Sequence, residues 1–226
     1  MDLSAIIHHQ VAAVRQEIAA ACRQAGRDPA TVRLIAVTKS QTPEVLAALA
    51  LAGILDLGEN RWEHQAEMVA QAQPGQRFHA IGRVQGRQLA KLAPLSVAIH
   101  SLCDPDHLLR LEQVCAGLDK TLEVFLQVNT SGEAAKAGLA PDALAEVADL
   151  ARRQPHLRLV GLMTMAPEGA DEALLHRCFA GLRECAQRED LTRLSMGMSQ
   201  DFPIAIAEGA TDLRIGTRLF TIPNHG

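Results

Sequence analysis

The sequence predicts an α/β protein built as a single (β/α)8 TIM barrel, with an extra helix at its N-terminus. Eight short apolar runs alternate with amphipathic segments, which indicates parallel strands joined by right-handed helical crossovers. The apolar runs are nearly continuous, as is typical of strands buried on both faces. No glycine-rich linker, charge block or low-complexity stretch divides the chain, so residues 1–226 are expected to form one domain. An open, doubly wound sheet is the alternative arrangement of the same elements.

The individual elements follow from local patterns. Residues 3–25 are expected to form the first helix, because apolar side chains recur there at helical spacing. Start signals such as Thr42-Pro43 and Asp104-Pro105 precede later helices. The strands are expected at residues 32–38, 54–58, 77–81, 97–101, 122–128, 157–163, 193–196 and 211–215. The further helices are expected at residues 43–52, 61–71, 85–92, 104–116, 141–153, 171–187 and 201–208.

The composition limits the classes of partner. The formal net charge is −4, the isoelectric point is near 6.1 and aromatic residues make up 3%, which argues against nucleic-acid binding. No apolar run is long enough to span a membrane, and the N-terminal residues lack the pattern of a secretory signal. We therefore expect no nucleic-acid or membrane partner, and a cytoplasmic location.

The cysteines and histidines show no metal-site pattern. The five cysteines are odd in number and include no C-x-x-C pair, which is typical of buried thiols in a reducing cytosol. The histidines, including His8 and His9, lack ligand spacing. We expect no metal site.

Two turns rich in small residues each follow one of the last two predicted strands. Gly197 and Ser199 lie after the seventh strand, and Gly216 and Thr217 lie after the eighth. Barrels of this kind commonly bind phosphate after strands seven and eight, where backbone amides and hydroxyls can approach it closely. The alternative for Ser199 is an ordinary helix N-cap. Two such turns in succession favour a phosphate site.

The first strand ends in Thr38 and Lys39, at the same edge of the barrel. A lysine in this place is expected to be partly desolvated, which favours the neutral amine that forms an imine. The alternative is a lysine whose head group lies in water. An amine and a phosphate site at one edge together indicate an aldehyde-bearing phosphorylated cofactor. We predict pyridoxal 5′-phosphate, held by Lys39 as a Schiff base.

Arg214 lies two residues before Gly216, so strand alternation places both on the same side of the sheet. An arginine pointing into the barrel needs a partner. One candidate partner is the pyridine nitrogen of the cofactor, which a fixed positive charge would keep unprotonated. The alternative is a salt bridge to Asp212 or to Glu59.

Glu59 and Asn60 follow the second predicted strand. They are expected to hydrogen-bond the 3-hydroxyl of the cofactor or to order Lys39, and an N-cap role is the alternative for Asn60. His79 and His100 lie in or at the ends of strands, and we interpret them as satisfied core groups rather than proton shuttles.

At these residues the sequence resembles the pyridoxal-phosphate homeostasis protein family, whose members are similar to the barrel domain of bacterial alanine racemase without its second domain. The resemblance covers nearly the whole chain after the first helix. It is carried by Ala36-Val37-Thr38-Lys39, Gly58-Glu59-Asn60, Phe78-His79-Ala80-Ile81-Gly82, Val128-Asn129-Thr130-Ser131, Gly161-Leu162-Met163-Thr164-Met165-Ala166-Pro167 and residues 194–217.

The resemblance implies a monomeric barrel like that of fold type III enzymes, which binds pyridoxal 5′-phosphate and takes part in its intracellular homeostasis. It also implies that cofactor-dependent apoenzymes receive the cofactor. The cofactor-binding residues that it implies are Lys39 as the anchor, Asn60 near the ring, Arg214 at the pyridine nitrogen, and Ser199, Gly216 and Thr217 at the phosphate.

The chain departs from the family pattern at two places. Arg61 and Trp62 stand where Tyr-Val is usual, and Arg87 and Gln88 stand where Asn-Lys is usual. These positions are expected beside the cofactor mouth, so they bear on any cofactor transfer that uses those side chains.

Two classes of function remain open, a cofactor carrier or regulator and a small racemase or related enzyme. The chain contains no tyrosine, so it lacks the tyrosine base that alanine racemase uses on one face of its substrate. It also ends about ten residues after the second turn, which leaves no room for a second domain. We therefore expect a non-catalytic protein. A barrel that binds another phosphorylated ligand is a third alternative.

Overall fold

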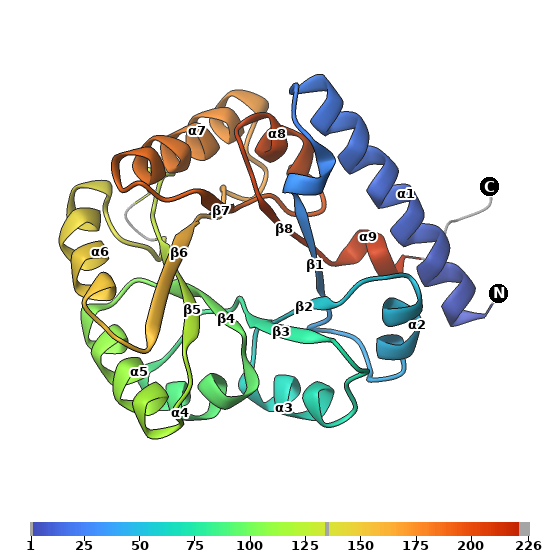
Figure 1. Ribbon diagram of the computed structural model, residues 1–226. Helices are drawn as coiled ribbons and strands as arrows, with labels where there is room; N and C mark the ends of the chain where they lie inside the picture. Colours follow the sequence, from blue (N-terminus) through green and yellow to red (C-terminus); the bar gives the residue numbers. More distant parts are fainter. Residues whose placement is uncertain (1, 134–135, 222–226) are drawn as a thin grey trace.

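The computed structural model describes residues 2–133 and 136–221. Within these residues eight parallel strands close into a barrel in chain order, from β1 next to β2 around to β8 next to β1. Figure 1 shows the ring of strands with the helices outside it. The predicted barrel is confirmed, and the open sheet is excluded. The strands are β1 (Arg33–Val37), β2 (Asp56–Glu59), β3 (Arg77–Ala80), β4 (Ala98–Leu102), β5 (Leu122–Gln127), β6 (Leu157–Met163), β7 (Arg193–Ser195) and β8 (Asp212–Ile215).

The helices of the described residues cover the outside of the barrel. The expected N-terminal helix is present as α1, which packs against α2, α8 and α9 beside β1 (Figure 1). The helices are α1 (Leu3–Gln24), α2 (Val45–Leu51), α3 (Trp62–Ala70), α4 (Leu89–Leu92), α5 (Pro105–Gly117), α6 (Leu144–Arg152), α7 (Glu172–Arg188), α8 (Phe202–Ala207) and α9 (Thr217–Phe220).

The predicted boundaries are wrong in a few places. The helix expected at residues 85–92 is instead a 3₁₀ turn at Gly86–Gln88, the short α4 and a second 3₁₀ turn at Ala93–Leu95. Pro94 limits α4, because proline has no amide proton to continue the helical hydrogen bonds. The helix expected from residue 43 begins at Val45, and the short α9 was not expected.

Two kinds of interior result from the alternation of side chains along the strands. The layer between the strands and the outer helices is apolar and contains most of the buried core. The inside of the barrel holds a small apolar cluster of Ala98, Phe125 and Met163 together with buried polar side chains such as His79, His100 and Arg214. No helix in the described part of the chain is long and apolar enough to cross a membrane.

Candidate functional site

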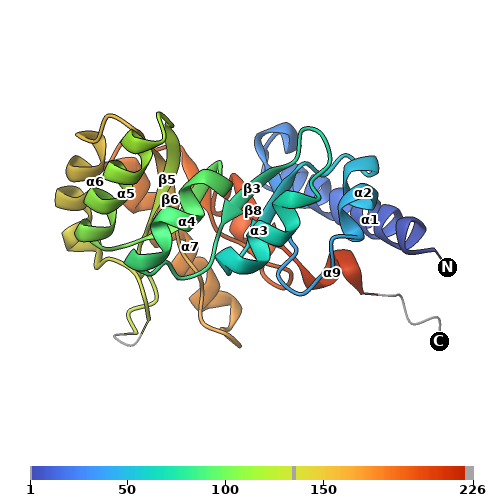
Figure 2. The ribbon, with the colours of Figure 1, turned by 90° about the horizontal axis from the view of Figure 1, so that it is seen from below.

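The two turns and Lys39 lie at the C-terminal ends of three neighbouring strands. Gly197 and Ser199 follow β7, Gly216 and Thr217 follow β8, and Lys39 follows β1. β8 pairs with β7 on one side and with β1 on the other. Figure 2 shows the molecule from the side, with α9, which directly follows β8, at this face of the barrel. Closure of the barrel therefore brings together residues from the two ends of the chain.

The contact between β8 and β1 is close at Gly216. A Cβ atom at this position would lie 3.2 Å from the carbonyl oxygen of Val37 and 3.3 Å from its Cβ. Gly216 is half-buried and the adjacent Thr217 is exposed. The absence of a side chain at Gly216 thus lets the two strand ends meet, while the Thr217 hydroxyl stays accessible.

The turn after β7 requires glycine at position 197. Gly197 has a φ of +92°, and a Cβ there would lie 2.7 Å from the Cβ of Ala205. The Met198 amide donates to the carboxylate of Asp201 at 2.5 Å, and Asp201 is the N-cap residue of α8. The alternative that Ser199 caps this helix is wrong. Ser199 is half-buried at the mouth of the barrel.

Lys39 is exposed, and the partial desolvation expected of it is wrong for this structure. The reason is its position beyond the last residue of β1. Thr38 is fully buried, and Lys39, the next residue, is exposed. The alternative of a lysine with its head group in water describes this structure.

The backbone on either side of Lys39 is held by a buried carboxylate. Glu59 is 1% exposed and accepts hydrogen bonds from the Thr38 hydroxyl and from Nδ1 of His64, the latter at 2.8 Å. Nε2 of His64 lies 3.0 Å from the carbonyl oxygen of Gln41. Since Thr38 and Gln41 flank the lysine, Glu59 and His64 brace the segment that carries it. We call these four residues, Thr38, Gln41, Glu59 and His64, the lysine brace.

His64 in the lysine brace faces an acceptor at each ring nitrogen. A carboxylate and a carbonyl can both be satisfied only when both ring nitrogens carry protons. Burial alone would lower the pKa of His64, but the hydrogen bond and charge of Glu59 and the Gln41 carbonyl raise it. The sequence analysis missed His64. Its position in the first turn of the helix after Glu59 was the available signal.

Asn60 follows β2, the strand on the other side of β1, and is exposed. Its backbone is fixed by Gly82, where a Cβ would collide with the Asn60 carbonyl oxygen. The N-cap residue of α3 is Arg61, so the N-cap alternative for Asn60 is wrong. Asn60 therefore lies at the same mouth as Lys39 without a capping role.

Arg214 points into the barrel and is 4% exposed. It donates from Nη1 to the Ser195 hydroxyl at 2.6 Å and from Nη2 to the Thr164 carbonyl at 3.0 Å. The expected alternative of a salt bridge to Asp212 is wrong, because that carboxylate binds Arg193 instead. The alternative of a salt bridge from Arg214 to Glu59 is also wrong, since Glu59 belongs to the lysine brace.

Arg214 is thus a buried cation whose described hydrogen-bond acceptors are both uncharged. Burial lowers its pKa to about 10, against the opposing effects of the more distant Asp201 and Asp212. The guanidinium stays positively charged at neutral pH. Ser195 and Thr164 were not expected as its partners, since the sequence does not show which strands face each other across the barrel.

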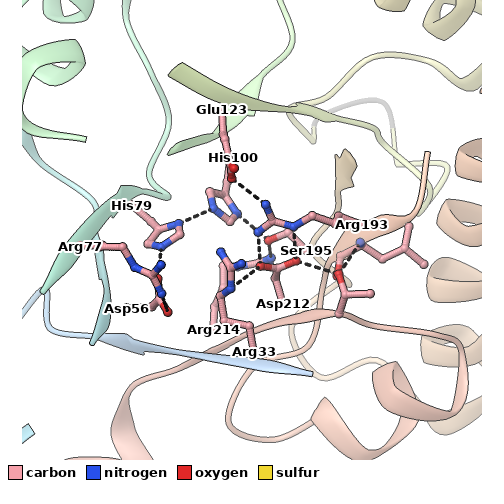
Figure 3. A network of polar contacts seen from close by, with 12 residues as sticks. Arg33, Asp56, Arg77, His79, His100, Glu123, Arg193, Ser195, Asp212 and Arg214 are labelled. Carbon is pink, nitrogen blue, oxygen red and sulfur yellow. Dashed lines mark hydrogen bonds and ion pairs between the residues drawn. The ribbon is translucent and has the colours of Figure 1, made fainter. Parts of the chain in front are cut away.

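His79 and His100 are fully buried, and each has hydrogen-bond partners at both ring nitrogens. His100 also stacks on Phe125, with ring centroids 4.2 Å apart. The interpretation of both histidines as satisfied core groups is confirmed. Figure 3 shows them between Asp56 and Ser195 in the middle of the barrel.

The two departures from the family pattern lie on neighbouring segments. The amine of Lys91, on α4, lies 3.8 Å from the ring centroid of Trp62 at the start of α3. Arg87 donates to the side chain of Gln85 at 2.9 Å, within the turn that precedes α4. Of the residues that depart from the family pattern, Trp62 therefore contacts Lys91, and Arg87 contacts Gln85.

Comparison with known proteins places this geometry in a family. The family described as "Alanine racemase, N-terminal domain" matches residues 10–223. The pyridoxal phosphate homeostasis protein of Pseudomonas aeruginosa is 41% identical over 97% of each chain. The chain belongs to the pyridoxal phosphate homeostasis protein family. A family member from Aquifex aeolicus is 35% identical over 92% of this chain and 94% of its own.

Solved structures with a similar fold include one with 31% sequence identity and one with much lower identity. PipY of Synechococcus elongatus, solved with PLP bound, has a TM-score of 0.82 and 31% identity over 95% of this chain and all of PipY. Alanine racemase from Clostridium difficile has a TM-score of 0.72 at 11% identity, over 93% of this chain and 57% of its own. The second likeness shows the barrel fold alone.

Proposed function

We propose that this protein binds pyridoxal 5′-phosphate at the C-terminal mouth of its barrel and acts in intracellular homeostasis of the cofactor, without being an enzyme. One observation carries the proposal: Lys39 and the two small-residue turns meet at the ends of β1, β8 and β7, beside the buried Arg214. The names of the relatives and the PLP bound to PipY support the same cofactor.

The residues present fit this cofactor. When bound, the cofactor supplies an aldehyde that forms a Schiff base with a neutral lysine amine. Lys39 is exposed, so its amine can be reached from the mouth, and the lysine brace limits the movement of the backbone on either side. Ser199 and Thr217 offer hydroxyl donors to phosphate oxygens, at turns where Gly197 and Gly216 allow close packing.

Arg214 supports a carrier over a catalyst. Its positive charge would disfavour a proton on the ring nitrogen of the cofactor, and an unprotonated ring is a poorer sink for electrons. The chain also contains no tyrosine to serve as the racemase-type base. Asn60 lies at the same mouth, and we assign it a place near the cofactor ring.

The proposal extends to the form of the protein and its partners. We propose a cytoplasmic monomer whose residues 1–226 make one alanine-racemase-like barrel domain, and which hands the cofactor to apoenzymes that depend on it. The packing of α1 on α2, near the start of the chain, and on α8 and α9, near its end, supports one unit. Light scattering will test the monomer, and transfer to an apoenzyme, followed as regained activity, will test the carrier role.

Reduction with borohydride is the decisive experiment. The protein is incubated with pyridoxal 5′-phosphate, reduced, digested and mapped by mass spectrometry. We expect the adduct on Lys39 and its loss in Lys39→Ala, while Lys91→Ala, which removes another exposed lysine, keeps it. Lack of any adduct at saturating cofactor would overturn the proposal. Turnover of an amino acid by the loaded protein would instead place it among the enzymes.

A further inference from the structure

A chain of buried hydrogen bonds crosses the barrel and ends at Arg214. Oδ1 of Asp56 lies 2.9 Å from Nε2 of His79, whose Nδ1 lies 3.0 Å from Nε2 of His100. Nδ1 of His100 lies 2.7 Å from the Ser195 hydroxyl, which accepts from Arg214 at 2.6 Å. Figure 3 shows these five side chains connected one to the next. We call them the barrel relay.

The relay connects opposite ends of the barrel. Asp56 is the first residue of β2, and it lines a cavity of about 490 Å³ at the N-terminal ends of the strands together with Arg33 and Arg77. Arg77 donates to Oδ2 of Asp56 at 2.7 Å. Arg214 lies in β8, two residues before the Gly216 turn. The relay therefore gives a change at Asp56 a hydrogen-bonded route to the cofactor mouth of the barrel.

The carboxylate of Asp56 determines the direction of every hydrogen bond in the relay. A carboxylate only accepts, so Nε2 of His79 must carry a proton. In a neutral His79, Nδ1 is then an acceptor, and it accepts a hydrogen bond from the protonated Nε2 of His100. This leaves Nδ1 of His100 as an acceptor for the Ser195 hydroxyl. Ser195 therefore donates to His100 and keeps its lone pairs for Arg214.

The reversed direction leaves the relay with one unpaired group. If His100 donated from Nδ1, the Ser195 oxygen would accept from both His100 and Arg214. The hydroxyl proton of Ser195 would then need another acceptor in a residue that is fully buried. A second proton on the histidine pair would also add positive charge beside Arg214.

The charges around His100 favour its neutral form. Burial, together with the charge that His79 would carry if it were protonated and the positive charges of Arg214, Arg193 and Arg33, lowers the pKa of His100 well below its usual value. Burial alone would raise the pKa of Asp56, but His79 and Arg77 lower it overall. The charged groups that surround the two histidines are Arg33, Asp56, Arg77, Glu123, Arg193, Asp201, Asp212 and Arg214.

We infer that Asp56, His79 and His100 are positioning residues, which fix the direction of the Ser195 hydroxyl and so hold the Arg214 guanidinium in place at the cofactor site. The effect on the cofactor rests on the proposed function, whereas the direction of the relay does not. The relay thereby couples the N-terminal mouth of the barrel, at Asp56 and Arg77, to the cofactor mouth at the other end.

Nitrogen NMR of the cofactor-free protein tests the direction of the relay. In the ¹⁵N-histidine-labelled protein at neutral pH, His79 and His100 should each carry a proton on Nε2 and none on Nδ1, and His100 should keep this state down to about pH 6. His64, in the same spectra, should carry both protons at the acid end. A protonated Nδ1 on His100 in the unaltered protein would overturn the inference.

A single distant substitution should reverse the relay. In Asp56→Asn, Arg77 will take the amide oxygen, so the amide NH₂ will face His79 and require Nε2 of His79 to accept. We expect both histidines to move their proton to Nδ1. The matched control is Glu112→Gln, which changes the carboxylate beside His156 outside the barrel and should leave His79 and His100 unchanged. An unchanged His100 in folded Asp56→Asn would refute the relay.

The absorbance of pyridoxal 5′-phosphate bound to the protein then tests whether the relay acts on Arg214. In Asp56→Asn the Ser195 oxygen is shared between His100 and Arg214, which loosens the guanidinium and makes the cofactor ring easier to protonate. The pH midpoint of the bound cofactor's absorbance should rise by about half a unit or more, and that of Glu112→Gln should match the unaltered protein. Equal midpoints in all three would overturn the positioning role. If borohydride finds no Lys39 adduct, the proposed function fails, while the NMR results still decide the relay.

Discussion

The lysine brace and the barrel relay use the same side chain, histidine, in opposite ways. His64 in the brace lies between a carboxylate and a carbonyl, two groups that only accept hydrogen bonds. His100 in the relay lies between another imidazole and a hydroxyl, two groups that can donate or accept. The surroundings raise the pKa of His64 and lower that of His100 well below its usual value.

The difference shows that the neighbours, and not burial alone, decide what a histidine does. Burial favours the neutral form of both. At His64 the nearby Glu59 and Glu67 outweigh that effect, whereas at His100 the nearby arginines add to it. The surroundings therefore favour the cationic form of His64, beside Lys39, and the neutral form of His100, which the proposed relay requires.

The largest expected effect is on stability when each ring is removed. His100→Ala deletes a buried ring stacked on Phe125 and leaves two polar atoms without a partner, so we expect a loss of about 3–4 kcal/mol. His64→Ala should cost only about 1 kcal/mol, because the His64 side chain is 16% exposed, so that water can enter in place of the ring and hydrate Glu59, which keeps its hydrogen bond from Thr38. Urea unfolding of both variants measures the difference. Equal losses would contradict the comparison.

The second largest effect concerns how the free energy of unfolding depends on pH in the acidic range. The pKa of His100 is lower in the folded than in the unfolded state, where it is about 6.5. Its contribution to stability is therefore complete above about pH 6.5 and is lost as the pH falls below that value. The unaltered protein should lose stability between about pH 6.5 and pH 5 more steeply than His100→Gln. His156→Gln is the control. If stability falls with pH at the same slope in His100→Gln as in His156→Gln, His100 is not neutral in the folded protein.

The opposite pH dependence is expected for the lysine brace. The folded pKa of His64 is raised, so its contribution is complete below about pH 6.5 and is lost as the pH rises through the folded pKa. Amide hydrogen exchange at Lys39 to Gln41, corrected for the intrinsic pH effect, should accelerate across that range. In His64→Gln the acceleration should be absent. Its persistence there would remove His64 from the brace.

The smallest effect on the fold is expected from Thr217→Val. Thr217 is exposed and lies outside both the brace and the relay, so stability should change by less than about 0.5 kcal/mol. Loss of one hydrogen bond to a charged phosphate should still weaken cofactor retention about tenfold, measured by equilibrium dialysis. The pH dependence of stability that comes from His100 and the pH dependence of amide exchange that comes from His64 should both be the same as in the unaltered protein. Undiminished retention would place the phosphate elsewhere.

The alternation of strands and helices was readable from the sequence because each element has its own periodicity. All eight strands were placed close to their observed positions, and the helices were least accurate where prolines interrupt them, as at Pro94. Lys39, Ser199 and Thr217 could be assigned to one mouth of the barrel, because parallel strands bring their C-terminal ends to the same edge. Their roles in binding the cofactor remain predictions.

The partners of the polar groups were not readable in this way. The sequence analysis offered Asp212 and Glu59 for Arg214, and the structure gives Ser195 and Thr164. Asp212 is nearer in sequence, but it lies where Arg193 reaches it from β7. Local patterns contain no information on which inward-facing side chains meet across a barrel.

By itself, the sequence determined the (β/α)8 barrel, its N-terminal helix and the strand ends at which small residues and Lys39 gather. These features depend on periodicity, turn chemistry and chain order, which are local properties. Only the tertiary structure decided that Lys39 is exposed, that His64 lies between two hydrogen-bond acceptors, and that Asp56 is linked to Arg214 through two buried histidines and Ser195. The physical reason is that exposure, pKa and hydrogen-bond direction depend on groups brought together by closure of the barrel, and these groups lie far apart along the chain.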